Sequence, residues 1–274
     1  MHPLVLTLLI ILAVLTVLFA LYLVLIAPGA KKNVRSFKNT KFAHRGLHGE
    51  GRAENSLSAF RAAVEKGYGI ELDVRLSSDK KLVVFHDDTL NRVVGIDGRV
   101  DSYTAEELSK MSLSGTADGV PLFSEVLELV AGRVPLLVEI KEDPGVSEVS
   151  EKTCEMLEKY KGDYLIESFN PLSLSTVAKH LPKAARGILS HRYYAYVQYR
   201  KPLYFLLQCL LFNRVCRPSF IAYDFRHAKN LSFRLARLMG ATTFAWTVRS
   251  EEEEKTAKKR GFDSVIFENY LPEK

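Results

Sequence analysis

The chain has 274 residues, of which 47% are hydrophobic and 26% are charged, a composition that excludes an intrinsically disordered or low-complexity protein. Its formal net charge is +6, and the excess lies before Glu50, the first acidic residue. From Glu50 onward the basic and acidic residues balance; the six basic residues before it are Lys31, Lys32, Arg35, Lys38, Lys41 and Arg45. A nucleic-acid-binding protein carries such an excess on its folded domain, so we expect no nucleic-acid partner.

The first segment of the chain is predicted to span a membrane once. Residues 4–27 are uncharged and mostly aliphatic, and about 20 such residues suffice to cross a bilayer as a helix. A cleaved signal peptide has a basic start and an apolar core of only about 7–15 residues, and neither is present. Residues 1–30 are therefore expected to be a retained anchor, followed by a basic juxtamembrane segment at 31–40. Basic residues beside a span favour the cytoplasmic side, so we expect a single-pass protein of the cell membrane with a cytoplasmic domain.

The remaining residues, 41–273, are predicted to form one domain in which strands and helices alternate. A helix is expected from Ser56 to Lys66 with Gly67 at its end, and Thr104 with Glu107 forms a capping-box pattern. Nine apolar runs are predicted strands: FAH, IELDV, LVVFH, PLLVEI, YLIES, RGIL, FIAYD, TFAWTV and SVIF.

This alternation indicates a parallel sheet covered by helices. A TIM (β/α)8 barrel, typically about 250 residues long, fits the length of the domain. A doubly wound open sheet is the alternative, but no glycine-rich turn follows the first strand. Because a barrel needs eight strands, either LVVFH or FIAYD is expected to lie outside it.

Carboxylates on two of the predicted strands indicate a metal-binding site. Side chains alternate along a strand, so Glu71 and Asp73 of IELDV share one face, and Glu139 and Lys141 of VEIK share another. Buried carboxylates repel one another without a cation, and an oxygen-only set suits Mg²⁺ or Ca²⁺. The alternatives are a surface-facing edge strand for the first pair and a simple ion pair between Glu139 and Lys141.

Two strand-end histidines are candidates for acid–base chemistry. His44 ends the first strand with Arg45 beside it, and His86 ends LVVFH and precedes Asp87. One histidine can hold a proton while the other lacks it, and arginine can clamp a phosphate. Trp246 is placed to wall a substrate pocket, although core packing is at least equally compatible with its position. The other histidines, His2, His48, His180, His191 and His227, have no such neighbours.

The ordered fragments HRG, ENSLSAF, ELDVRLSSD, VVFHDDTLNR, VEIK, ESFNP and AWTV resemble the glycerophosphodiester phosphodiesterase family, from about Lys41 to Pro272. The resemblance implies a TIM barrel that hydrolyses glycerophosphodiesters to glycerol 3-phosphate and an alcohol. It implies these roles: His44 and His86 as the acid–base pair, Arg45 and Lys141 as phosphate contacts, Glu71, Asp73 and Glu139 as metal ligands, and Glu54 and Asn55 as pocket residues. The chain departs from the family pattern at Ala53, at Ser56 and in IFENYLP, which puts the choice of substrate in doubt more than the activity.

An insertion is expected at about 190–218, where basic and aromatic residues gather. No acidic residue occurs from Ser168 to Tyr223. The segment 191–217 is interpreted as a helical insertion packed on the barrel, with an interfacial helix on the membrane as the alternative. The substrate is then either a soluble glycerophosphodiester or a membrane lysophospholipid. A catalytically inactive, lipid-binding barrel is the rival from another class, and the complete set of histidines and carboxylates argues against it.

Overall fold

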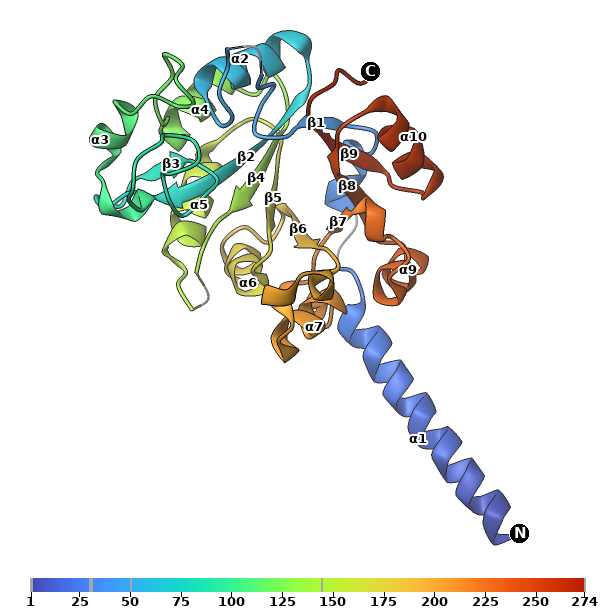
Figure 1. The fold of residues 1–274 in the computed structure, drawn as a ribbon. Helices are drawn as coiled ribbons and strands as arrows, with labels where there is room; N and C mark the ends of the chain where they lie inside the picture. Colours follow the sequence, from blue (N-terminus) through green and yellow to red (C-terminus); the bar gives the residue numbers. More distant parts are fainter. Residues whose placement is uncertain (1, 30–31, 50, 144, 274) are drawn as a thin grey trace.

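A closed sheet of eight parallel strands forms the centre of the structure (Figure 1), a computed structural model that describes residues 2–29, 32–49, 51–143 and 145–273. The barrel strands are β1 (Lys41–Ala43), β2 (Gly69–Leu76), β4 (Leu136–Ile140), β5 (Tyr164–Ser168), β6 (Ala185–Ser190), β7 (Phe220–Asp224), β8 (Thr242–Val248) and β9 (Ser264–Phe267). Strand β1 pairs in parallel with both β9 and β2, which closes the sheet. The predicted TIM barrel is confirmed.

The ninth strand, β3 (Leu82–Val84), lies outside the barrel and pairs antiparallel with the end of β2. It belongs to LVVFH, so FIAYD is the barrel strand β7. Only five residues, 77–81, separate β2 from β3. A parallel crossover needs a dozen residues or more, so this short connection permits only a hairpin.

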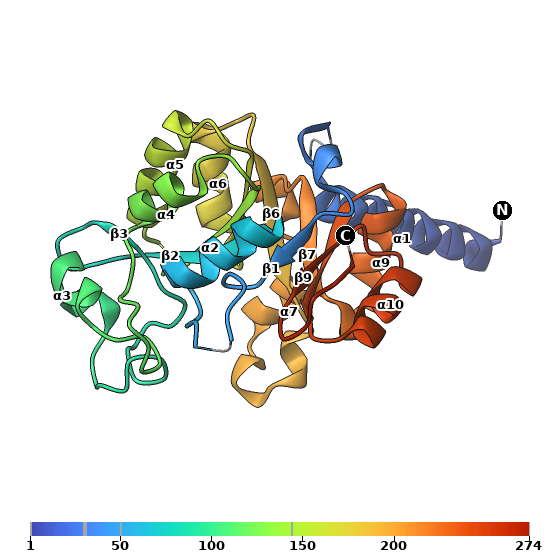
Figure 2. The ribbon, with the colours of Figure 1, turned by 90° about the horizontal axis from the view of Figure 1, so that it is seen from above.

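Helices surround the barrel, with α4, α5 and α6 on one side and α9 and α10 on the other (Figure 2). The α-helices are α1 (Pro3–Ile26), α2 (Leu57–Lys66), α3 (Ala105–Ser109), α4 (Phe123–Val130), α5 (Glu148–Lys159), α6 (Pro171–His180), α7 (Pro202–Gln208), α8 (Asn213–Cys216), α9 (Leu231–Leu238) and α10 (Glu251–Lys259). Gly67, predicted to end α2, is left-handed, and Thr104 and Glu107 form the predicted capping box. Ser56, predicted as the first residue of the helix, is its N-cap and accepts from the Ala59 N–H. Short 3₁₀ helices complete the fold: η1 (Lys32–Phe37), η2 (Val100–Ser102), η3 (Tyr193–Ala195), η4 (Val197–Tyr199) and η5 (Phe225–His227).

The segment expected between anchor and domain packs against the barrel. Val34 and Phe37 of η1 are buried in the cluster that fills the barrel interior, together with Phe42, Phe220 and Phe244. Its basic residue Lys38 is paired with Asp263 at 2.7 Å, and Lys41, the first residue of β1, is paired with Glu254 at 2.7 Å. Lys31, part of the basic segment predicted at 31–40, lies outside the described residues.

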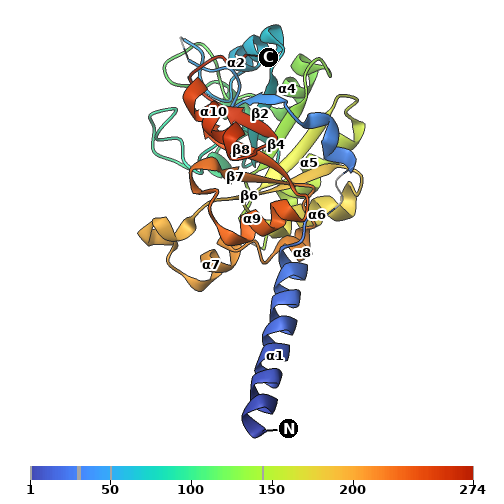
Figure 3. The ribbon, with the colours of Figure 1, turned by 90° about the vertical axis from the view of Figure 1, so that its right-hand side faces the viewer.

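Helix α1 is long and apolar enough to cross a membrane and projects from the domain as a single helix (Figure 3). Its last turns are part of the domain. Ile26 is fully buried in a core cluster, its carbonyl accepts a hydrogen bond from Asn213 Nδ2 at 2.9 Å, and the Tyr22 hydroxyl lies 2.7 Å from Ser232 Oγ on α9. The end of the predicted anchor is therefore fixed to the barrel's outer layer.

The predicted insertion comprises η3, η4, α7 and α8, between β6 and β7. In Figures 1 and 3, α7 lies at the end of the molecule from which α1 projects. Val197, Leu203 and Phe205 leave much of their apolar surface exposed, whereas α8 packs against α6 and α1. One part of the insertion is thus packed on the barrel and another part presents apolar side chains to the surroundings.

Candidate active site

Most of the predicted site residues converge on one cavity of about 200 Å³ at the carboxyl ends of the barrel strands. The predicted residues that line it are His44, Arg45, Glu71, His86, Glu139, Lys141 and Trp246. They come from β2, β4 and β8, from the positions just after β1 and β4, and from the loop after β3, where His86 lies two residues beyond the strand rather than at its end. Catalytic groups of TIM barrels lie at this face.

A row of carboxylates crosses three neighbouring strands. Asp73 on β2 is in register with Glu139 on β4, which is in register with Glu167 on β5, so all three side chains point into the barrel. Glu71, Asp73 and Glu139 are buried and offer oxygens that lie within 4.8 Å of one another. Strand β2 lies between β1 and β4 in the closed sheet. The structure therefore contradicts the alternative of a surface-facing edge strand.

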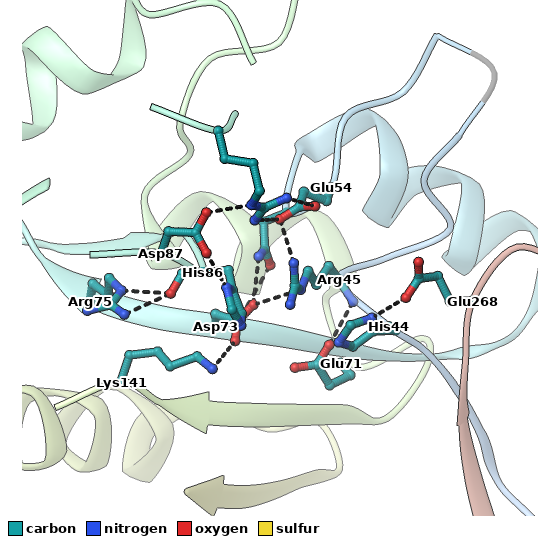
Figure 4. A network of polar contacts seen from close by, with 12 residues as sticks. His44, Arg45, Glu54, Glu71, Asp73, Arg75, His86, Asp87, Lys141 and Glu268 are labelled. Atoms are coloured by element: carbon teal, nitrogen blue, oxygen red, sulfur yellow. Dashed lines mark hydrogen bonds and ion pairs between the residues drawn. The ribbon is translucent and has the colours of Figure 1, made fainter. Parts of the chain in front are cut away.

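Two cations face these carboxylates (Figure 4). Lys141 Nζ lies 2.6 Å from Glu139 Oε1 and 3.2 Å from Asp73 Oδ1, and Arg45 Nε lies 3.6 Å from Asp73 Oδ2. The ion pair considered for Glu139 and Lys141 therefore exists, within the larger cluster. The Arg45 backbone N–H also donates to Glu71 Oε2 at 2.7 Å, which orients that carboxylate.

The pKa values of the carboxyls follow from this arrangement. Burial, then repulsion by Asp73 and Glu139, raises the pKa of Glu71 well above its usual range. Burial also raises the pKa of Glu167 and of Glu139. Burial opposes the charged form of Asp73 as well, but Lys141, His86 and Arg45 hold the pKa of that carboxyl below its usual range. The raised pKa values of Glu71 and Glu139 indicate that the two cations do not fully stabilise the ionised form of these buried carboxyls.

Glu54 and Asn55, predicted as pocket residues, contact other site residues in the structure. Asn55 is buried; its Nδ2 donates to Asp73 Oδ2 at 2.8 Å and its Oδ1 accepts from the Asp73 N–H at 3.3 Å. Glu54 accepts from Arg45 Nη1 at 2.8 Å and from Arg92 at 2.7 and 2.8 Å. These hydrogen bonds hold Asp73 and Arg45 in place. Direct contact of Glu54 or Asn55 with the substrate stays a prediction.

His44 is oriented by a residue from the far end of the chain. Its Nδ1 lies 2.8 Å from Glu268 Oε2, in the loop after β9. Burial lowers the pKa of His44 to about 4, against the opposing effect of the Glu268 hydrogen bond. The hydrogen bond with His44 lowers the pKa of Glu268 to about 2. His44 is therefore neutral near pH 7, with Nε2 as the ring nitrogen available for proton exchange.

His86 is held in a similar way by its neighbour. Its Nδ1 lies 2.6 Å from Asp87 Oδ1, and its carbonyl accepts two hydrogen bonds from Arg75, at 2.8 and 3.0 Å. Arg92 Nε donates to the other oxygen of Asp87 at 2.6 Å. Each candidate histidine thus pairs its Nδ1 with a carboxylate.

Besides Glu268, three residues of the cavity walls were missed by the reasoning from sequence. Glu167 is buried in the cavity wall, and its Oε2 has no hydrogen-bond partner within the described part of the chain. Its position inside an apolar run, like that of Glu139, was the available signal. Phe169 and His191 contact the Trp246 ring, with centroid distances of 5.6 and 6.0 Å, so Trp246 is part of the cavity wall and not of the core alone.

The residues present fit a hard divalent cation. The converging donor atoms of Glu71, Asp73 and Glu139 are all carboxylate oxygens, the ligands that Mg²⁺ and Ca²⁺ prefer. The buried Oε2 of Glu167, which has no hydrogen-bond partner among the described residues, adds a further carboxyl oxygen beside them. An additional positive charge at this position would balance the cluster.

Comparison with known proteins identifies the chain's relatives. A protein 36% identical over 161 residues is the glycerophosphodiester phosphodiesterase of Bacillus altitudinis, but the match spans 54% of this chain and only 65% of that relative. The glycerophosphodiester phosphodiesterase of Caldanaerobacter subterraneus is 30% identical over 250 residues, 85% of this chain and 95% of the relative. Human lysophospholipase D GDPD1 is 28% identical over 148 residues, about half of each chain.

The fold has solved counterparts as well. The structure of an Oleispira antarctica phosphodiesterase in complex with the product sn-glycerol-3-phosphate covers 85% of this chain and 94% of its own, with a TM-score of 0.70 at 24% identity. Residues 44–271 match the model of the glycerophosphoryl diester phosphodiesterase family, a span that begins at His44 and includes every predicted site residue. The chain therefore belongs to the glycerophosphoryl diester phosphodiesterase family and is an enzyme of that family.

Proposed function

We propose that this protein hydrolyses glycerophosphodiesters to glycerol 3-phosphate and an alcohol at a divalent cation held by Glu71, Asp73 and Glu139. The observation that carries the proposal is the cluster of three buried carboxylates with oxygens within 4.8 Å, facing the same cavity as two cationic side chains and two histidines. When bound, the cation would polarise a phosphoryl oxygen and offset the negative charge that develops on it.

The chain's own residues support the remaining roles. Arg45 and Lys141 are the positive groups available to the phosphate oxygens, and both line the cavity. We assign His44, neutral and held by Glu268, the removal of a proton from the attacking oxygen. We assign His86, held by Asp87, the donation of a proton to the departing alcohol oxygen. Phe169 and Trp246 form the apolar side of the cavity.

A direct assay tests this function. The full-length chain, purified in detergent, should release glycerol 3-phosphate from glycerophosphocholine or glycerophosphoethanolamine when Mg²⁺ or Ca²⁺ is present. A variant with His180→Ala, at an exposed position at the end of α6, serves as a folded control with a histidine removed away from the cavity. Absence of glycerol 3-phosphate from a panel of head groups with either ion would overturn the proposal.

A lysophospholipid is a second candidate substrate. It shares the glycerophosphodiester group and adds one acyl chain to the glycerol. Two observations favour it: the chain is similar to human lysophospholipase D GDPD1, and an apolar, aromatic-walled cavity adjoins the catalytic one. An inactive, lipid-binding barrel has less support because the cavity retains both histidines and all three carboxylates.

We also propose that α1 is a retained membrane anchor and that the barrel is cytoplasmic. Retention is supported by the burial of Ile26 and by the bonds that join Asn213 and Ser232 to α1, since cleavage would remove packed residues. The cytoplasmic side is supported by the basic residues after the helix, although Lys38 and Lys41 pair with acidic residues of the barrel. Protease added to intact cells should leave a cytoplasmic barrel uncut, and rapid cleavage would reverse the orientation.

A further inference from the structure

A second cavity, of about 430 Å³, lies beside the catalytic cavity and is roughly twice its size. Its walls come from the insertion, from the start of α6 and from the loops after β4 and β5. Glu142 and Asn170 line it on the side of these loops, and most of the other lining residues are apolar or aromatic, among them Leu172, Tyr199, Leu203, Leu207 and Phe212. Cavities of this size and character bind apolar parts of small molecules. Glycerol, phosphate and a charged head-group alcohol have too little apolar surface to use such walls.

The two cavities adjoin at an aromatic partition. Phe169 lines both of them, and its ring lies 5.8 Å from Lys141 Nζ on the catalytic side. His191 lines the second cavity and packs against both Phe169 and Trp246, the latter a wall of the first. A molecule with its phosphate at Lys141 can therefore extend an apolar substituent past Phe169 into the second cavity.

The second cavity also lies on the side of the molecule that faces lipid when α1 spans a bilayer. The insertion and the projecting part of α1 occupy the same end of the structure (Figures 1 and 3). Leu172 and Leu203, two of its lining residues, are about half exposed, at 50% and 52%. Val197 and Phe205 add exposed apolar surface on the same insertion. The cavity thus has an apolar rim on the side from which a lipid would enter.

We propose that the second cavity binds the acyl chain of a lysophospholipid while its glycerophosphodiester group occupies the catalytic cavity. The inference rests on the proposed function, because it assigns the second cavity to a substrate of the same site. Three features support an acyl chain as the occupant: the second cavity adjoins the catalytic cavity, its walls are mostly apolar, and its rim exposes apolar side chains beside the proposed anchor helix. Water adds a hydroxyl to phosphorus and a proton to the departing oxygen, the bond from phosphorus to the head-group alcohol breaks, and an acylglycerol phosphate remains.

The experiment compares chain lengths within one head group. The full-length chain in nanodiscs is first assayed with glycerophosphocholine and glycerophosphoethanolamine, to find the head group that is cleaved faster. Lysophospholipids with that head group and acyl chains of about 6 to 16 carbons are then assayed, because chains in this range would fill the cavity to different extents. Release of the head-group alcohol is measured. The value of kcat/KM should rise with chain length, by up to about fourfold per added methylene, and then level off when the cavity is filled.

Variants on α7 separate the cavity from simple partition of the lipid into the nanodisc. Leu207→Glu puts a charge into the cavity, and Leu203→Trp fills its rim without adding charge. Either should lower the ratio of lysophospholipid to glycerophosphodiester turnover by tenfold or more for the longer chains, since several methylenes lose their contacts. Leu206→Glu is the matched control, because Leu206 lies on the same helix but does not line the cavity. This control should keep the wild-type dependence on chain length.

The outcomes distinguish the two proposals. Glycerophosphodiester hydrolysis with no dependence on acyl chain length would overturn the acyl-chain site and leave the proposed function intact. A chain-length dependence unchanged in both Leu207→Glu and Leu203→Trp would also overturn it, because the dependence would then arise elsewhere. Hydrolysis of neither class would overturn the proposed function, and the acyl-chain site with it. If Leu207→Glu loses glycerophosphodiester turnover through misfolding, Leu203→Trp, at a half-exposed position, decides the question.

Discussion

Replacing Glu71 by glutamine should abolish hydrolysis and yet stabilise the metal-free protein. The substitution removes one charge from three buried carboxylates whose oxygens lie within 4.8 Å. At that separation each repulsive pair costs about 3.5 kcal/mol at an effective dielectric constant of about 20. The glutamine oxygen can still accept the hydrogen bond from the Arg45 N–H. The variant therefore loses the charge and retains the local geometry.

The gain in stability has an upper limit, because the wild-type protein can escape the repulsion by protonating Glu71. At pH 7.5, about three units above the usual glutamate pKa, that proton uptake costs about 4 kcal/mol. We expect a gain of about 1–4 kcal/mol, or a rise in Tm of several degrees for a domain of this size. The pKa of Glu71 is raised in the folded state, so the folded state binds more protons and wild-type stability falls as the pH rises from about 4.5 through the raised pKa. The gain from glutamine should therefore be larger at pH 8 than at pH 5.

The assay is thermal unfolding of the full-length chain in detergent, with chelator or with Mg²⁺ or Ca²⁺. Ion addition should raise the Tm of the wild type more than that of Glu71→Gln, because the variant has lost a ligand charge. Glu65→Gln, at an exposed position of α2, is the matched control and should leave every Tm unchanged. A variant less stable than wild type in chelator, or equally stabilised by the ions, would refute the reasoning.

Three further predictions address other parts of the site and the anchor. Chelation of divalent metal should abolish hydrolysis, and addition of either Mg²⁺ or Ca²⁺ should restore it. Full activity in chelator, with no metal found by elemental analysis, would contradict this prediction. His44→Ala and His86→Ala should each lower kcat by about 10²-fold or more with the fold intact. Glu268→Gln should lower kcat about tenfold with KM unchanged, because the charged hydrogen bond that orients His44 becomes a neutral one. A near-normal kcat in any of these variants would contradict the role assigned to that residue. A fragment beginning at residue 32 should be active but have a lower Tm than a fragment beginning at residue 20, because burial of Ile26 contributes about 1.5–3 kcal/mol to the free energy of unfolding. Equal Tm values for the two fragments would show that this packing does not stabilise the domain.

The barrel and most of its site could be predicted because both follow from local pattern. Glu71, Asp73, Glu139 and Lys141 sit in apolar runs whose alternation fixes which way they point, and the closed sheet then brings them together. The choice between LVVFH and FIAYD was also available from sequence, since the five-residue connection before Leu82 is too short for a parallel crossover. Glu167 was available too, as an acidic residue in an otherwise apolar strand.

Other features depend on contacts that no local pattern encodes. Glu268 reaches His44 across 224 positions, and the sequence IFENYLP contains nothing that selects that partner. The role of His191 arises only when the insertion folds back and places the ring against Trp246. Asn55 follows Glu54 in sequence, yet it turns inward to Asp73 while Glu54 turns to Arg45. Such assignments require the tertiary structure, because each depends on distant backbone segments meeting.

The packing of Ile26 and Tyr22 joins the end of α1 directly to the barrel, and this has a consequence if α1 spans a bilayer. If α1 is the membrane anchor proposed above, the part of it that lies clear of the barrel, residues 3–21, is about 29 Å long, which matches a hydrocarbon core of about 30 Å, and a thinner membrane would make the helix tilt. Because the joint is made of buried side chains and hydrogen bonds, the barrel tilts with the helix. In a thinner membrane the helix leans further and the insertion changes its height above the lipid head groups. For an α1 that spans the bilayer, membrane thickness would then set how closely the two cavities approach the lipid surface.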